Sequence, residues 1–408
     1  MRRTLAAVVL TTVGSSAAPA ASPGDVWYGP KTLGLANASR AQLFPLLTTP
    51  SASWPSLAAR TSTVKLFLDM LYEWDGAAHG TGATDDELRS LVATLRQRKL
   101  RVGLEVGGVR WGSRGLCNAS AALAYAAREQ SQAKRWLALG GTIDSLTTDH
   151  AIVWNIRGTS NPNPNPHKQS PDCDPPVPMA QRIDAVAQVF GSWRALLGAS
   201  ASLGFIESLG FWEIAGADGT NFTNTDPAHL NNITGWVPKL ADVTALLLAA
   251  AARHNPTPAV PLLDHFQIDY AMEGVEYDTL AYGAARSPAA GLNYNRILGA
   301  EAVMRTQGLA TGVIANAFPA KPQAESGCLV GCDPSFTPSH SAAVRTLNFS
   351  RGYMQQPSRG SAHAVLEQWQ PAPSEVGPET AADTGMWMAS RAAAILLPNG
   401  ASERSVSL

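Results

Sequence analysis

The sequence predicts an α/β protein built as a single (β/α)8 TIM barrel with extended βα loops. Short apolar runs alternate with longer helical patterns along the chain, and no compositional break divides them. The main alternative, an open doubly wound sheet, usually carries a Gly-rich phosphate turn after its first strand. The first run, "VWYGPKTLG", is not such a turn, and no Gly-x-Gly-x-x-Gly or Walker sequence occurs.

Eight apolar runs are predicted as the buried parallel strands, alternating with eight helices. The runs are 26–29, 63–69, 101–108, 142–149, 202–208, 264–270, 310–318 and 363–369. Helical patterns are located at 84–100, 119–139, 179–198, 237–253, 293–307, 340–354 and 381–396. The first of these begins with a capping box, Thr84 and Glu87, and carries one apolar stripe.

The two ends of the chain differ in composition from the rest. Residues 1–22 join two arginines, a short apolar run and small residues, as in a secretory signal peptide; the alternative is an uncleaved anchor. Residues 23–398 form the predicted barrel domain, and 399–408 a polar tail. We expect a secreted or lumenal protein without a membrane span, because no apolar run reaches the ~20 residues that a spanning helix needs. The net charge of −1 argues against a nucleic-acid partner.

Secretion gives the four cysteines a predicted role, because disulfides persist in oxidising compartments. Local spacing favours a bond between Cys328 and Cys332, which leaves Cys117 to pair with Cys173. The alternative is buried free thiols, and no Cys-x-x-Cys pair indicates zinc. Glycosylation sequons, each expected at a surface loop or helix end, begin at Asn37, Asn118, Asn221, Asn232 and Asn348.

Acid or amide side chains lie at or near the ends of most predicted strands. They are Asp69, Glu105, Asp149, Glu207, Asp269, Asn316 and Glu367. Any one of the acids is also explained as a helix N-cap. However, the carboxyl ends of barrel strands meet on one face, where gathered carboxylates cost free energy unless they are paired, protonated or used. The pattern therefore predicts a functional site on that face.

Glycoside hydrolysis is the chemistry that uses paired carboxylates, one as proton donor and one as nucleophile or base. We expect Asp149 to be the nucleophile or electrostatic stabiliser and Glu207 the general acid/base, with Asp269 as the substitute for either. Aromatic rings near the same strand ends would stack on sugars, although each is also explained by core packing. The predicted substrate-binding residues are Tyr28, Glu105, Trp111, His150, Tyr270, Asn316, Glu367 and Trp369.

The segments "SLTTDH" and "EQWQPAPSEVGPET" are similar in style to strand ends of glycoside-hydrolase-like (β/α)8 barrels. Over residues 25–398 the chain resembles that superfamily, without a specific family. The resemblance implies a secreted hydrolase of an oligo- or polysaccharide. One large clan has Asn-Glu on its fourth strand, where this chain has Asp149-His150, and the chitinase-like acidic run is absent. The strand positions resemble those of α-galactosidases and α-amylases, which pair an Asp on strand four with an acid on strand five or six.

Three alternatives stay open. A catalytically inactive carbohydrate-binding barrel would keep the fold without the chemistry. A metal-dependent hydrolase would use ligand types found at Asp149, His150, Asp264, His265 and Asp269. Adjacent residues of an extended strand point to opposite sides, which disfavours a shared site for Asp149 and His150. We therefore expect no metal and no cofactor. A lyase of acidic polysaccharides would need a cation such as Arg110 or Arg157.

Overall fold

The computed structural model describes most of the chain between Gly24 and Pro398. The described residues are 24–30, 37–73, 82–107, 119–153, 177–209, 212–219, 221–222, 239–269, 275, 293–316, 337–367 and 373–398. None of the described helices is long and apolar enough to cross a membrane.

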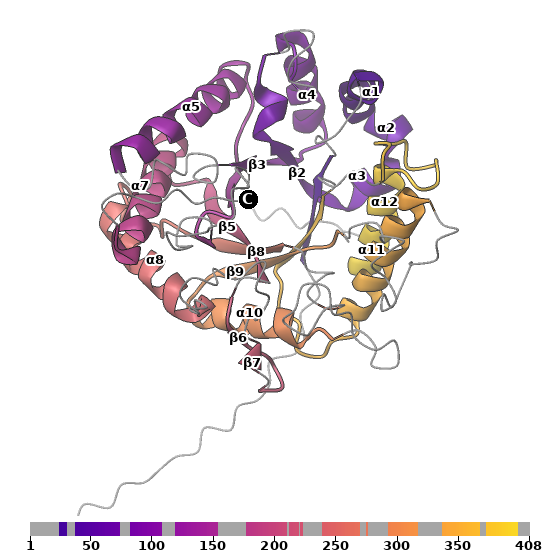
Figure 1. Cartoon of the computed structure of the whole chain (residues 1–408). Helices are drawn as coiled ribbons and strands as arrows, with labels where there is room; N and C mark the ends of the chain where they lie inside the picture. The colour runs from indigo at the N-terminus through magenta and orange to yellow at the C-terminus, as the bar shows by residue number, and fades with distance from the viewer. Residues whose placement is uncertain are drawn as a thin grey trace, which may run out of the picture.

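Eight parallel strands close into a barrel, which confirms the predicted fold class (Figure 1). The strands are β1 (Asp25–Gly29), β2 (Thr61–Phe67), β3 (Arg101–Val106), β4 (Ser145–Asp149), β5 (Ser202–Ser208), β8 (His265–Asp269), β9 (Ala310–Ile314) and β10 (His363–Glu367). Their order around the barrel is that of the sequence, and β1 pairs with β10 to close it. Two short antiparallel strands, β6 (Ile214–Ala215) and β7 (Asn221–Phe222), form a separate ribbon.

Helices surround the strands, as Figure 1 shows in a view along the barrel. They are α1 (Asn37–Thr48), α2 (Pro50–Ser53), α3 (Pro55–Arg60), η1 (Leu68–Leu71), α4 (Asp85–Gln97), α5 (Ala119–Ala138), α7 (Met179–Leu197), α8 (Leu240–His254), α10 (Asn295–Thr306), α11 (Pro338–Met354) and α12 (Gly385–Leu396). The crossover from β1 to β2 contains α1, α2 and α3, whose ranges the sequence pattern did not locate. Its prolines at positions 45, 50 and 55 interrupt the helical periodicity.

Helix α4 forms for the reasons that its sequence indicates. The side chain of Thr84 accepts from the backbone N–H of Glu87 at 3.2 Å, and the Glu87 carboxylate accepts from the N–H of Thr84 at 2.8 Å. This capping box satisfies two N–H groups that a helix start leaves open. The predicted apolar stripe is buried and consists of Leu88, Leu91, Val92 and Leu95.

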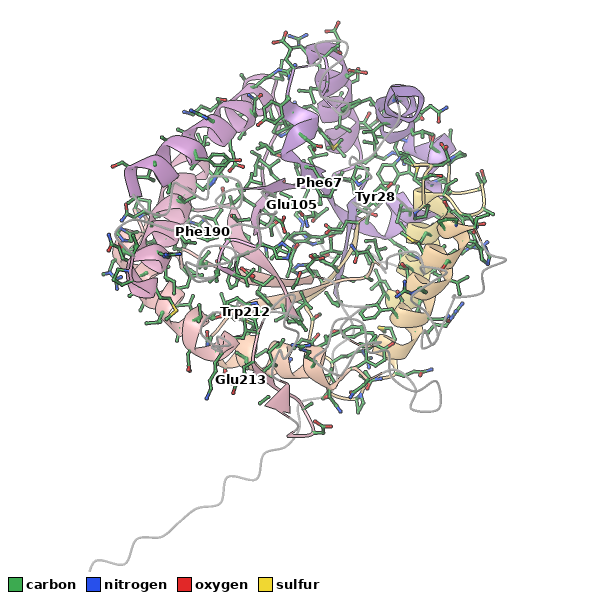
Figure 2. The ribbon with its side chains drawn as sticks, in the orientation of Figure 1. Tyr28, Phe67, Glu105, Phe190, Trp212 and Glu213 are labelled. Carbon is green, nitrogen blue, oxygen red and sulfur yellow. The ribbon has the colours of Figure 1, made fainter. Side chains whose placement is uncertain are left out.

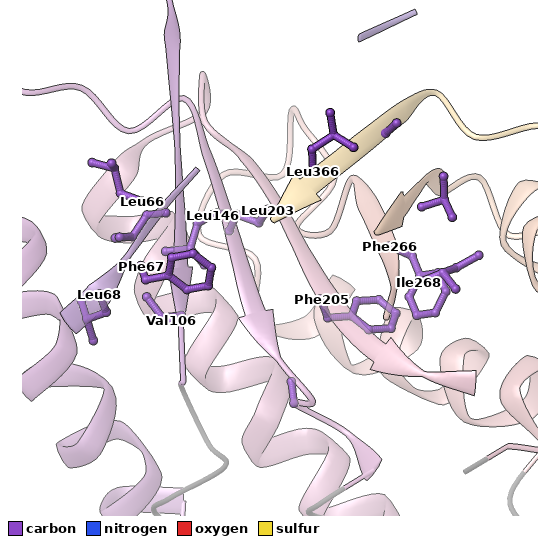
Figure 3. Close-up of a cluster of buried hydrophobic side chains, with 14 of the residues drawn as sticks. Leu66, Phe67, Leu68, Val106, Leu146, Leu203, Phe205, Phe266, Ile268 and Leu366 are labelled. Carbon is purple, nitrogen blue, oxygen red and sulfur yellow. The ribbon is translucent and has the colours of Figure 1, made fainter. Parts of the chain in front are cut away.

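The two faces of each barrel strand belong to different environments, because side chains alternate along a strand. The outward face packs under the helices in one continuous apolar core, part of which is shown in Figure 3. The inward face holds a smaller cluster of Trp27, Ile206, Ile314 and Val365. Strand register therefore decides whether a given side chain supports the fold or lines the barrel interior.

Aromatic rings fill the barrel interior near its amino end, and a glycine leaves room for one of them. The Trp27 ring stacks on His363 with centroids 4.2 Å apart, and His265 meets Trp27 edge-on at 5.7 Å. Burial lowers the pKa of His363 to about 3, with the nearby charges of Lys65 and Arg101 acting in the same direction. Gly312 leaves the space that the His363 ring occupies, because a Cβ there would lie 2.1 Å from Nε2 of His363.

Gly312→Ala is therefore expected to destabilise the protein by about 1–3 kcal/mol through overpacking. Gly103→Ala is the matched control, since its Cβ would meet its nearest neighbour, Thr63 Cγ2, at an ordinary 3.4 Å. Denaturant unfolding of both variants measures the difference. Equal stability of the two would contradict the interior packing described here.

Candidate active site at the carboxyl end of the barrel

Inward-facing polar side chains from neighbouring strands meet at the carboxyl end of the barrel. Glu105 is paired in register with Thr147, Asp149 with Ile206, and Ser208 with Asp269. Because Ile206 belongs to the interior cluster, its register partner Asp149 also faces inward. Figure 2 shows Glu105 inside the ring of strands, whereas Glu213 lies toward the outer edge.

A buried lysine on β2 contacts three other strands in this interior, β3, β8 and β10. The Nζ of Lys65 lies 2.5 Å from Oε2 of Glu105 and 2.6 Å from Oε2 of Glu367, and it donates to Oε1 of Gln267 at 3.1 Å. Burial alone would lower the pKa of Lys65, but the two carboxylates outweigh it and raise this pKa above its ordinary value. Lys65 is thus a permanent cation between two acids.

A second network begins at His150. Its Nδ1 hydrogen-bonds to Oδ1 of Asp149, and its Nε2 lies 2.5 Å from Oγ of Ser208. Ser208 in turn donates to Oδ2 of Asp269 at 3.3 Å, so both ring nitrogens of His150 act as donors. Burial opposes protonation of His150, but the surrounding carboxylates, Asp149 above all, raise its pKa to about 9.

The backbone at His150 explains how adjacent residues share one site. Strand β4 ends at Asp149, and His150 has a φ of 47°, in the left-handed region. This turn brings the imidazole ring back onto the Asp149 carboxylate. The expectation that the two side chains point to opposite sides was wrong, because it assumed that the strand continues through His150.

The two networks leave more carboxyl groups than cations in the interior. Lys65 and His150 face Glu105, Asp149, Asp269 and Glu367, so not all four acids can be charged without strong repulsion. A proton on Glu105 relieves this excess of negative charge. Burial, opposed by Lys65, together with the charges of Glu367 and Asp149, raises its pKa to about 8.

Exposure separates the reachable acids from the supporting ones. The side chains of Glu105 and Asp149 are 14% and 17% exposed. Lys65, His150, Ser208, Asp269 and Glu367 are buried beneath them. Among the described acids of the two networks, Glu105 and Asp149, on the adjacent strands β3 and β4, are therefore the ones that a bound molecule can contact.

The structure places Glu207 differently from the prediction. Glu207 lies between the inward-facing Ile206 and Ser208, so its side chain leaves the opposite face of β5. Its Oε1 accepts from the backbone N–H groups of Ile152 at 2.7 Å and Val153 at 3.2 Å. Burial, opposed by His150 and these two bonds, raises the pKa of Glu207 to about 7. Geometrically it caps the turn after β4 and does not line the interior.

Two predicted substrate-binding residues have opposite outcomes. Tyr28 faces the helices, with its ring 5.7 Å from that of Trp54, and belongs to the outer core. The structure thus corrects its assignment, because the inward positions of β1 are those of Trp27 and Gly29. Asn316 lies at the carboxyl end of β9, and its Nδ2 is buried without a hydrogen-bond partner among the described residues. Asn316 therefore has a donor available for a ligand.

Other predicted residues lie outside the described residues. These are Trp111, Tyr270, Trp369, Arg110, Arg157 and the four cysteines 117, 173, 328 and 332, together with Asn118 and Asn232. The backbone places Asn37 in α1 and Asn221 in β7. Asn348 lies inside α11, where its Oδ1 accepts from Arg351 at 3.1 Å, and so is neither in a loop nor at a helix end.

Three ligand-type atoms of Asp149, His150 and Asp269 lie within 4.8 Å of one another, a spacing that a metal ion could fit. A histidine that binds a metal ion must be neutral, because its ligating nitrogen needs a free lone pair. Both nitrogens of His150 are engaged as donors, so the ring in this state offers no such lone pair. Asp264, the third acid of the metal hypothesis, accepts from the N–H of Leu203 and from Arg194, at the opposite end of the barrel.

Sequence reasoning missed Lys65, Ser208 and Gln267. A usable signal existed for two of them. Lys65 interrupts the apolar run "TVKLFLD", and Gln267 interrupts "HFQID". A lysine is almost never fully buried unless it is paired, so a lysine inside a buried strand indicates nearby acids.

No protein-family model matches the chain, and no curated protein does. Similar solved structures include a β-1,4-mannanase of glycoside hydrolase family 113, with 11% identity and a TM-score of 0.42 over 92% of this chain and 98% of the mannanase. A β-glucosidase from Exiguobacterium marinum has 10% identity and a TM-score of 0.43, covering 81% of this chain and 79% of that one.

An aldo-keto reductase from Klebsiella pneumoniae is also similar, with 10% identity and a TM-score of 0.38 over 91% of this chain and 84% of the reductase. The similar structures thus include glycoside hydrolases and a barrel enzyme of another class. At these identities and TM-scores the likeness concerns the fold and carries no argument about chemistry.

The His150 network makes stability depend on pH. The pKa of His150 rises from 6.5 to about 9 on folding, so its contribution is complete below pH 6.5 and is lost as pH rises through 9. We expect the free energy of unfolding to fall by roughly 1–3 kcal/mol over this interval. The pKa of Glu105 is also raised, so its deprotonation lowers the free energy of unfolding further as pH rises to about 8.

His150→Gln should make this decline clearly shallower in denaturant titrations at pH 6, 7.5 and 9. His254→Gln is the control, because His254 pairs with Asp184 at 2.9 Å on the outside of the barrel. If both variants keep the wild-type decline, His150 is not the protonated centre of the network.

Proposed function

We propose that the protein is a glycoside hydrolase that cleaves an oligo- or polysaccharide with Glu105 and Asp149 as its two carboxyl groups. One observation carries the proposal. These two acids are partly exposed on adjacent strands, and their environments favour opposite protonation states. Pairs of carboxyl groups whose environments differ in this way are typical of acid and nucleophile assignments.

Glu105 is the proton donor. A pKa of about 8 keeps it protonated near neutral pH, so it can give a proton to the leaving oxygen of a glycosidic bond. Lys65 holds the Glu105 carboxyl group from below at 2.5 Å. This contact fixes its orientation, and it stabilises the carboxylate once the proton has left.

Asp149 is the nucleophile or the electrostatic stabiliser of the oxocarbenium-like transition state. The protonated His150 ring donates to its Oδ1, which favours the carboxylate form and fixes its direction. Asp269 and Ser208 hold the other side of the ring, so Asp269 takes a supporting role. Glu207, assigned from sequence as general acid/base, is replaced in that role by Glu105.

Substrate hydroxyls would find polar partners around this pair. Asn316 has a buried amide donor available, whereas Glu367 lies below the pair and holds Lys65 in place. We propose further that the protein acts after secretion, consistent with its signal-peptide-like first 22 residues.

A second candidate follows from the same contacts, because Ser208, His150 and Asp149 form a Ser–His–Asp chain of hydrogen bonds. In that reading Ser208 would attack an ester. The burial of these residues argues against an esterase. Ser208 is fully buried, and the partly exposed member of the three is Asp149. The protonated His150 is also a poor base for Ser208.

Variant kinetics separate the roles of the acids. Glu105→Gln should lower kcat/KM on unactivated glycosides by about 10²–10⁴, but only mildly on dinitrophenyl glycosides, whose leaving group needs no proton. Asp149→Asn should lower both by at least ~10³. For the wild type, kcat/KM should fall above about pH 8, and this limb should vanish in Glu105→Gln.

Glu207→Gln is the control, expected to lower thermal stability while the folded fraction keeps its activity. If instead Glu207→Gln shows the leaving-group dependence and Glu105→Gln does not, the sequence-based assignment is right and ours is wrong. Binding of sugars without any cleavage would favour an inactive carbohydrate-binding barrel. Labelling of Ser208 by a fluorophosphonate probe would favour the esterase.

A further inference from the structure

A separate cavity of about 210 Å³ lies at the opposite end of the barrel from the candidate active site. It opens between the carboxyl ends of α4 and α5 and the starts of β3 and β4. Val92, Leu95, Leu100 and Trp136 form an apolar wall. Its size suits a single ring rather than an extended ligand, since sites for drug-sized ligands are typically ~300–1,000 Å³.

The charged residues around this cavity are mainly cationic. Arg96, Lys99 and Arg101 line it, with Asp144 as the one acid in its lining. Asp144 is already engaged, because its Oδ2 accepts from the N–H of Val102 at 2.8 Å and from Thr142 Oγ1 at 3.2 Å. Arg101 is paired with Asp25, which leaves Arg96 and Lys99 as the cations most available to a ligand.

The position of Lys99 is a second, independent observation. The N–H of Leu100 bonds to the carbonyl of Leu95 at 2.9 Å, which is the Schellman arrangement at the end of α4. Lys99 occupies the left-handed position of this motif, with φ of 54°, where glycine is strongly favoured. The side chain of Lys99 therefore lines the cavity from a backbone position that glycine usually occupies. Such outliers cluster at ligand-binding sites.

A hydrogen bond fixes the orientation of the Arg96 side chain. Its Nη2 donates to the carbonyl of Gly140 at 2.7 Å, across the cavity from α4 to the end of α5. A guanidinium held at one corner keeps further N–H groups for a carboxylate or sulfate. Gly140, with φ of 90°, and Gly141 contribute no side chains that would fill this space.

We propose that this cavity binds an acidic sugar unit, carboxylated or sulfated, of a polysaccharide. Arg96 and Lys99 would neutralise the anionic group, and the apolar wall would contact the ring. The site is remote from Glu105 and Asp149, so anion binding here does not depend on their roles, whereas the choice of a sugar as ligand rests on the proposed action on a polysaccharide. Its effect would be to hold the protein on an acidic polymer.

The test is binding, measured by isothermal titration calorimetry with the intact protein. The probes are oligogalacturonates and sulfated dextran oligosaccharides, with neutral dextran oligosaccharides for comparison. Lys99→Gly removes the cation and relieves the backbone, so it should weaken acidic-sugar binding about threefold to fivefold while the Tm stays equal or rises. Arg96→Gln combined with Lys99→Gly should weaken binding about tenfold or more.

Arg89→Gln is the matched control, since Arg89 is an exposed cation of the same helix that pairs with Asp86 at 2.7 Å. It should leave binding unchanged. The response to the two probes distinguishes carboxylate from sulfate as the preferred group. The proposal is overturned if the Arg96/Lys99 variant binds both probes as the wild type does. It also fails if a single-stranded DNA of equal charge binds as tightly, because the surface would then attract polyanions of any kind.

Discussion

The ammonium group of Lys65 lies between the carboxyl groups of Glu105 and Glu367 in the barrel interior. Four strands are tied together at this point, β2, β3, β8 and β10, because Lys65 also donates to Gln267. Two carboxylates so close, in a largely buried site, would repel each other by roughly several kcal/mol without a counter-ion. Because Lys65 stays charged, Glu105 and Glu367 can both point inward, and polar side chains can gather at these strand ends.

One cation does not balance this interior, and in the proposed hydrolase this imbalance supplies the proton donor. His150 adds a second positive charge beside Asp149 and Asp269, yet acids still outnumber cations. The excess is relieved by a proton on Glu105, whose pKa is raised to about 8. A neutral carboxylic acid and a carboxylate thus stand on adjacent strands, each fixed from below by a buried cation. This preorganisation is what a charge-developing transition state requires.

Side chains alternate between the two faces of each strand, and this alternation decides whether a strand-end acid joins the interior network. Glu207 and Ser208 are neighbours in sequence, but Ser208 joins the interior network and Glu207 caps the backbone after β4. Tyr28 and Trp27 divide in the same way between the outer core and the interior. The left-handed turn at His150 is the exception that places two consecutive side chains in one site.

Sequence by itself determined the barrel, the strand positions, the capping box of α4, and the set of strand ends at which polar groups gather. These features follow from local periodicity and capping, which short segments encode. It did not determine which pleat face Glu207 or Tyr28 occupies, because a shift of one residue in register reverses the faces. The pairing of Lys65 with Glu105 and Glu367, and the raised pKa of Glu105, depend on strands far apart in the chain. Only the closed tertiary structure brings those charges together and so decides which acid keeps its proton.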